Sequence, residues 1–82
     1  MEAEEAFGIV LRELRVKKGL SQELLAHESG IERNYISLLE LGKNSASIKI
    51  IFKLMPVLGV SAAEFMRKVE TLLLNNQNQK TG

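Results

Sequence analysis

The chain has 82 residues, enough for one small domain, and 45% of them are hydrophobic, which allows a packed core. It has no cysteine, which excludes disulfides, iron–sulfur clusters and thiolate zinc sites, and its single histidine excludes a histidine-based metal cage. Eleven Lys and Arg residues nearly balance ten Asp and Glu residues, so the net charge of +1 alone indicates no partner. Apolar runs are too short to span a bilayer, and the first five residues are acidic where a signal peptide is basic. We therefore expect a single soluble, cytoplasmic domain with no membrane contact, no metal, no cofactor and no evident small-molecule ligand.

The first half of the chain predicts three helices separated by glycines. Apolar residues recur at helical spacing over residues 4–17, and Gly19 supplies the C-terminal stop. Ser21 caps a short second helix that extends through about residue 28. A third helix spans about residues 33–41 and ends at Gly42. The residues of the second helix that we expect to face inward are Leu24, Leu25 and Ala26.

The second half predicts two more helices and a tail. Ser47 caps a fourth helix, whose last turn we expect Pro56 to kink or fray. Ser61 and Glu64 have the spacing of a capping box at the start of a fifth. The expected inner face of the fourth helix consists of Ile48, Ile51, Leu54, Met55 and Leu58. No apolar residue follows Leu74, so the sequence predicts a domain over residues 1–74 and a disordered polar tail over residues 75–82.

The segment from Leu20 to Gly42 is the most informative part of the sequence. Two short helices here are joined by a tight turn that contains Gly30, a residue that tolerates positive φ. Two helices that cross steeply need a small residue at their contact, and Ala26 provides one. The segment therefore predicts a helix-turn-helix formed by the second and third of five helices, in an all-α domain.

The sequence resembles the lambda-repressor-like, or XRE-type, helix-turn-helix regulators. The resemblance covers roughly residues 7–66. The matching residues are Leu14-Arg15, Gly19-Leu20-Ser21-Gln22, Leu25-Ala26, Gly30-Ile31, Ile36-Ser37, Glu40, Gly42 and Leu58-Gly59-Val60-Ser61. The run from Arg33 to Ser37 also resembles the small controller proteins of restriction–modification systems. The resemblance implies a compact five-helix DNA-binding domain.

The third helix has the composition expected of a recognition helix. At about 100° per residue, one arc carries polar and apolar groups that suit base edges, while the opposite side faces the core. The predicted base-reading residues are Arg33, Asn34, Ser37 and Leu38. Arg suits guanine, Asn suits adenine, Ser suits either, and Leu38 suits a thymine methyl. A polar arc alone is also what a solvated helix face shows, but its place in a helix-turn-helix favours DNA.

A second group of residues is predicted to contact the DNA backbone. Gln22 lies in the first turn of the second helix, where free N–H groups attract a phosphate. The other members lie around the start of the third helix and the loop before the fourth, and they are Tyr35, Lys43, Asn44, Ser45 and Ser47. The resemblance implies backbone contacts for the glutamine and for this loop. Ser47 is expected to cap its helix as well.

Glu40 falls at the seam between the core and the expected DNA face, so its carboxylate needs a cation. The resemblance implies that Arg15 is this cation. We interpret Arg15 and Glu40 as a structural ion pair that joins the first helix to the third, and not as a catalytic pair.

Two functional hypotheses remain open, and neither is an enzyme, because the sequence shows no phosphate-cradling loop and no nucleophile–base pair. The first is a homodimeric transcription factor that reads a palindromic operator. The second is an antitoxin or accessory subunit whose fifth helix binds a different protein, with DNA binding secondary. Both use an apolar stripe on that helix, which for the homodimer would form the interface: Phe65, Met66, Val69, Leu72 and Leu73.

Overall fold

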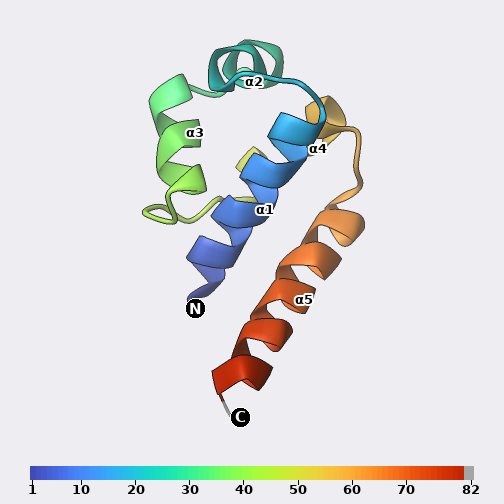
Figure 1. Cartoon of the computed structure of the whole chain (residues 1–82). Helices are drawn as coiled ribbons and strands as arrows, with labels where there is room; N and C mark the ends of the chain where they lie inside the picture. Colours follow the sequence, from blue (N-terminus) through green and yellow to red (C-terminus); the bar gives the residue numbers. More distant parts are fainter. Residues whose placement is uncertain (81–82) are drawn as a thin grey trace.

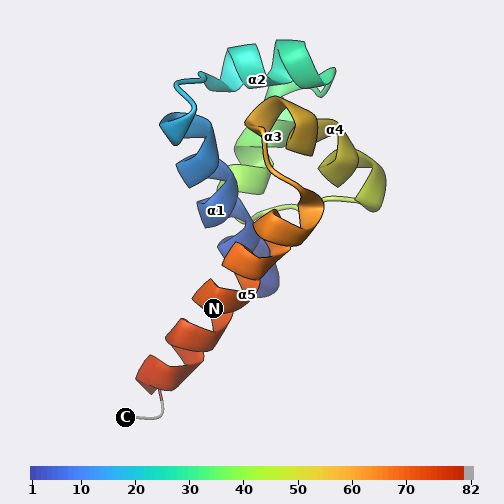
Figure 2. The ribbon, with the colours of Figure 1, turned by 90° about the vertical axis from the view of Figure 1, so that its right-hand side faces the viewer.

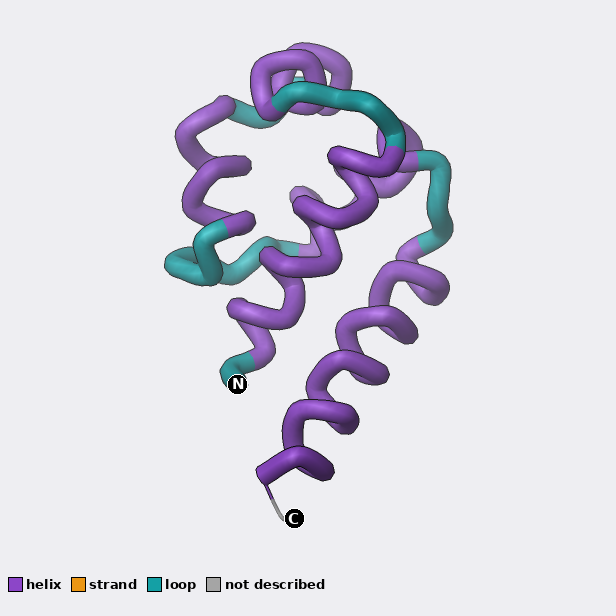
Figure 3. Tube along the Cα trace, in the orientation of Figure 1, coloured by secondary structure: helices purple, strands orange, loops and turns teal. Residues whose placement is uncertain are grey.

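The computed structural model describes residues 1–80, with side chains over residues 1–77. This part of the chain folds into five α-helices and contains no strand, which confirms the all-α prediction (Figures 1 and 3). The helices are α1 (Ala3–Lys17), α2 (Gln22–Ser29), α3 (Arg33–Glu40), α4 (Ile48–Leu58) and α5 (Ala62–Lys80). None of them is long and apolar enough to cross a membrane.

Three serines begin helices as the sequence predicts. The Ser21 hydroxyl accepts a hydrogen bond from the Leu24 N–H at 3.0 Å, and the Ser47 hydroxyl accepts one from the Ile50 N–H at 3.2 Å. Ser61 and Glu64 form the predicted capping box, in which each residue's side chain accepts from the other's backbone N–H. These bonds satisfy N–H groups that the first turn of a helix otherwise leaves without a partner.

Helix α1 lies at the centre of the fold. It packs against α5 on one side and α3 on the other, while α2 packs across α3 and α4 (Figures 1 and 2). The rings of Phe7 and Phe65 meet between α1 and α5, with centroids 4.8 Å apart. The core combines buried apolar side chains from all five helices, and the fully buried ones include Leu11, Leu25, Ile36, Leu39 and Leu54. The core therefore holds α3 against α1, and α2 against α3 and α4.

Two apolar residues that were expected inward face solvent instead. Leu24 is 42% exposed because it precedes Leu25, the completely buried residue of the short helix α2, and is rotated from it by about 100° around the helix axis. Ile48 is 74% exposed because it begins α4, whose buried residues start only at Leu54. Helical spacing identified the buried face of α4 correctly but not where the core ends along it.

The ends of the last two helices bear on two further expectations. Helix α4 continues through Pro56 to Leu58, and the Gly59 N–H donates to the Met55 carbonyl at 2.9 Å, so its last turn is not frayed, while the kink at Pro56 stays a prediction. Helix α5 continues to Lys80, so residues 75–80 are helical where the sequence predicted a disordered tail, and residues 81 and 82 lie outside the described part. Each residue added to an existing helix needs only one further hydrogen bond, so a polar segment can extend it without burying anything. The last turns of α5 project from the body of the molecule (Figure 2).

Candidate nucleic-acid interface

Helices α2 and α3 are joined by the tight turn that the sequence predicts. Gly30 adopts a left-handed conformation with φ of 73°, and its N–H donates to the Ala26 carbonyl at 2.9 Å. The Ile31 N–H donates to the same carbonyl at 3.2 Å, and the Ile31 side chain is buried. A side chain at residue 30 would strain this backbone, so glycine is required here. The two hydrogen bonds to the Ala26 carbonyl hold the turn in place, and α2 and α3 therefore form one unit.

Helix α3 separates a buried face from an exposed one. Ile36 and Leu39 are completely buried, whereas Arg33 and Asn34 lie exposed in its first turn. Ser37 is half-buried and Leu38 is exposed on the following turn. The structure thus brings all four predicted base-reading residues to the outward side of α3, with a cation, an amide, a hydroxyl and an apolar side chain.

The position of α3 depends on a glycine that sequence reasoning did not single out. Gly8 lies on α1 beneath the C-terminal end of α3, and a Cβ atom at this position would be 2.3 Å from the Leu39 carbonyl oxygen and 2.7 Å from that of Glu40. Only glycine allows the two helices to approach so closely. A glycine inside an apolar helical pattern is the signal that could have identified this contact, because it lowers helix propensity without an evident local reason.

The predicted ion pair is present and is part of a larger network. The Arg15 Nε donates to Glu40 Oε2 at 2.6 Å and its Nη2 donates to Oε1 at 3.0 Å, an arrangement with two parallel bonds. The Gln22 amide also donates to Glu40 Oε1 at 3.0 Å. The hydrogen bonds that Arg15 donates to Glu40, and the attraction of the Glu40 charge, raise the pKa of Arg15, while burial acts against them. The network links α1, α2 and α3 at one point.

The predicted backbone-contact residues lie on two edges of this unit. Gln22 is at the start of α2, and Lys43 is exposed in the loop between α3 and α4. The Tyr35 hydroxyl donates to the Ser45 carbonyl at 2.8 Å, and the Ser45 hydroxyl donates to a Glu4 carboxylate oxygen at 3.1 Å. The loop that carries Lys43, Asn44 and Ser45 is therefore held to both α3 and α1.

Comparison with known proteins identifies the architecture. The profile of the helix-turn-helix family matches residues 11–65, which include α2, the turn and α3. The chain belongs to the XRE-type helix-turn-helix family. Its members are transcriptional regulators and not enzymes, and the family implies double-stranded DNA as a partner. In the described part of the chain, no three His, Asp or Glu side chains are grouped as metal ligands would be.

Relatives of this helix-turn-helix regulator include controller proteins. This chain is 38% identical over 61 residues to the control protein C.BamHI of Bacillus amyloliquefaciens, and the match covers 73% of this chain and 75% of that protein. The solved restriction-modification controller protein C.AhdI of Aeromonas hydrophila is 44% identical, with a TM-score of 0.73 and coverage of 76% of this chain and 94% of that one. The clp gene regulator ClgR of Corynebacterium glutamicum gives a TM-score of 0.92 at 27% identity, covering 99% and 86%. Some matched regulators are longer, and the chain spans 32% of their length.

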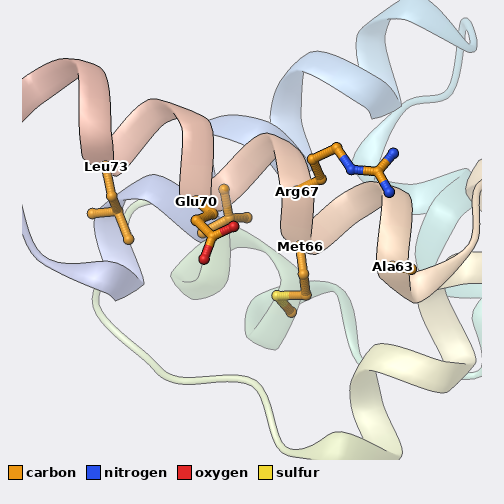
Figure 4. A pocket seen from close by; sticks show the side chains of 6 residues that line it. Ala63, Met66, Arg67, Glu70 and Leu73 are labelled. Atoms are coloured by element: carbon orange, nitrogen blue, oxygen red, sulfur yellow. The ribbon is translucent and has the colours of Figure 1, made fainter.

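The fifth helix of this family member divides the predicted apolar stripe. Phe65 and Val69 are buried in the chain's own core, while Met66 is exposed and Leu72 and Leu73 are half-buried. A shallow hollow of about 440 Å³ lies along this helix, and Figure 4 shows Met66, Glu70 and Leu73 on the same side of it while Arg67 extends away. Of the predicted interface residues, those with surface to offer are therefore Met66, Leu72 and Leu73.

Proposed function

We propose that this regulator binds a palindromic operator as a homodimer, with α3 of each copy in the major groove. The observation that carries the proposal is the exposed arc of α3, on which Arg33 and Asn34 lie at the N-terminal end. That end of a recognition helix contacts base edges in helix-turn-helix proteins. The guanidinium group of Arg33 can donate two hydrogen bonds to guanine and the Asn34 amide can pair with adenine, while Leu38 offers an apolar contact for a thymine methyl.

Contacts to the DNA backbone would hold α3 in register. Gln22 at one edge and Lys43, Asn44 and Ser45 at the other lie on elements that are fixed to α3. Ser47 caps α4, and its neighbouring N–H groups form a second helix start that suits a phosphate. The Tyr35 hydroxyl donates its only hydrogen to the Ser45 carbonyl, so Tyr35 holds the loop. Donation to a phosphate would require that hydrogen bond to break.

The proposed target is an operator that controls a restriction–modification operon. Support comes from the identity with C.BamHI and C.AhdI, which are named as controller proteins. The proposed base-reading arc on α3 and the proposed dimer interface on α5 are the two surfaces that such a regulator would use.

Selection of bound sites from random duplex DNA tests the base-reading assignment. We expect Arg33→Ala to cost roughly 1–3 kcal/mol on the selected site and to relax the preference at one guanine. Lys43→Ala is the matched control, because it should weaken binding to all sequences similarly and lower the salt slope by about one. An unchanged sequence preference in Arg33→Ala would contradict the assignment.

The proposed dimer interface lies on α5. Met66, Leu72 and Leu73 expose apolar surface on α5. The buried side chains of Phe65 and Val69 pack the same helix against the core. A two-fold axis along α5 would make this surface self-complementary. It would also have to place two recognition helices about 34 Å apart, one turn of DNA.

Sedimentation of the double variant Met66→Glu with Leu72→Glu tests the interface. We expect monomers that keep their helical content and lose operator affinity, because two buried carboxylates would repel each other across the axis. Glu70→Gln, on the same helix face, is the control and should leave the dimer intact. A dimer that survives the double variant would locate the contact elsewhere, and a wild-type chain that associates only with another protein would favour the accessory-subunit hypothesis.

A further inference from the structure

A second hollow, of about 220 Å³, lies where the start of α1, the loop before α4 and the middle of α5 meet. Most of its wall is apolar, since Phe7 and Val69 belong to the core and Met66 is 37% exposed. Ala3 and Ala46 complete this wall, and their short side chains leave the space open. At about 30 Å³ for each water molecule in the liquid, the hollow has room for roughly seven waters, or for one small organic molecule.

One end of the hollow is polar and carries a negative charge without a cation. Glu4 lies there beside Asn44 and Ser45 of the loop, and the Ser45 hydroxyl donates to Glu4 Oε2 at 3.1 Å. Within the part of the chain that the structure describes, the Glu4 side chain accepts no other hydrogen bond and forms no ion pair. The half-buried carboxylate therefore has one oxygen free to accept hydrogen bonds from a ligand.

An apolar wall next to an unpaired carboxylate favours one kind of ligand. An anion would be repelled by Glu4, and a purely apolar molecule would leave this carboxylate without a partner. A primary ammonium group, like that of a lysine, has three donors, enough for the free Glu4 oxygen and for the Asn44 amide oxygen. A short apolar body attached to it would cover surface of Phe7 and Met66 that water now contacts.

We propose that this hollow binds a small primary ammonium compound with a short apolar body, and that its ammonium group lies on Glu4. Glu4 also contacts Ser45, which the proposed function places on the DNA backbone, so its negative charge opposes a phosphate at that position. A ligand that neutralises Glu4 removes this repulsion and raises the affinity for DNA. The binding site stands independently of DNA, and only the effect on affinity rests on the proposed function.

Titration of the whole chain with phenethylamine, in the absence of DNA, tests the site. Amide NMR signals around Phe7, Ser45 and Met66 should shift in a saturable way. Phenethyl alcohol has the same apolar body without the charge, so it should bind about tenfold more weakly, the loss expected for one charged hydrogen bond. Equal affinity for the amine and the alcohol would overturn the site.

Three variants locate the ammonium group and the apolar body. Glu4→Gln should weaken amine binding to the level of the alcohol, while Glu13→Gln, which removes an exposed carboxylate of α1 outside the hollow, should leave it unchanged. Ala3→Leu should fill the hollow and abolish binding although it keeps Glu4. Unchanged amine binding in either Glu4→Gln or Ala3→Leu would also overturn the site.

Affinity for a selected duplex, measured at constant ionic strength, tests the effect on DNA. Saturating amine should raise the affinity of the wild type by about threefold, the effect of one exposed charge. Glu4→Gln should show this gain without the amine and should not respond to it, because its amide oxygen still accepts from Ser45 but carries no charge. Amine binding without any gain would refute the effect on DNA. If the wild type binds no duplex, the proposed function fails, and the titration without DNA still decides the site.

Discussion

The Glu40 side chain is only 4% exposed, yet Arg15 balances its charge and both of its carboxylate oxygens accept hydrogen bonds. Arg15, itself 12% exposed, supplies two hydrogen bonds and Gln22 a third. A buried ion pair adds little net stability, because both partners lose their hydration when the protein folds. Its importance becomes apparent when one partner is removed, since the other is then left charged and buried. At the residue scale, the intact pair therefore adds little net stability, whereas the loss of either partner would be costly.

We predict that Arg15→Ala lowers the free energy of unfolding by about 3 kcal/mol, as measured by urea denaturation, because it leaves Glu40 without a cation. Glu40 raises the pKa of Arg15 above its ordinary value, so this guanidinium remains charged at neutral pH and loses its charge only as the pH rises into strong alkali. The exposed Glu23→Gln serves as the control and should change stability by less than about 0.5 kcal/mol. Similar small effects in both variants would remove the structural role assigned to Arg15.

At the scale of elements, α2 and α4 begin in the same way but have different surroundings. Each is capped by a serine hydroxyl, Ser21 for α2 and Ser47 for α4. Ser47 follows the loop that carries Lys43, which the proposed function places on a DNA phosphate. Ser21 lies next to Gln22, whose side chain is directed to Glu40. We therefore predict that the Ser21 cap is purely structural, whereas the Ser47 cap also serves DNA binding.

Ser21→Ala and Ser47→Ala should each lower the free energy of unfolding by about 1 kcal/mol, the usual cost of losing a helix cap. Only Ser47→Ala should also reduce DNA affinity, measured at a temperature at which both variants are fully folded. Equal losses of DNA affinity in Ser21→Ala and Ser47→Ala would contradict a separate contact between Ser47 and DNA.

The sequence predicted the elements well because each helix start and stop depends on a few neighbouring residues. Ser21, Ser47, Ser61 and Gly30 identified these ends, and the structure places each cap where they indicated. Contacts between elements were harder to predict. The Arg15–Glu40 pair was found through the family resemblance, but the Gln22 bond to Glu40 and the approach at Gly8 depend on how far apart the helices lie. Periodicity carries no information about such distances.

At the scale of the whole molecule, the described part of the chain measures 43 × 23 × 22 Å, and its long dimension comes from α5 projecting beyond the other helices (Figure 2). Asn75 and Gln77 on this projection are exposed, and no apolar residue follows Leu74. The buried contacts of α5, Phe65 and Val69, lie in its first half. The helix therefore has a part that belongs to the core and a part that only extends the structure.

Removal of residues 75–82 should leave the domain folded and change the free energy of unfolding by less than about 1 kcal/mol, because a polar helix end of this length is marginal by itself. Thermal unfolding followed by circular dichroism would measure this. Removal from Leu72 onward is the comparison, and it should weaken self-association as well as stability. A large loss of stability in the shorter truncation would show that the last turns of α5 pack against something that the monomer lacks.

The contact at Gly8 separates two tasks that many binding surfaces combine. Helix α3 rests on α1 through its own backbone carbonyls, 2.3 and 2.7 Å from the point where a Cβ would be, so its position does not depend on its outward side chains. We therefore expect substitutions at the proposed base-reading residues, Arg33, Asn34, Ser37 and Leu38, to change the sequence preference of α3 without moving the helix. A scaffold of this kind lets new operators arise by exchanging a few surface residues, and the same property makes the domain a suitable starting point for redesigned specificity.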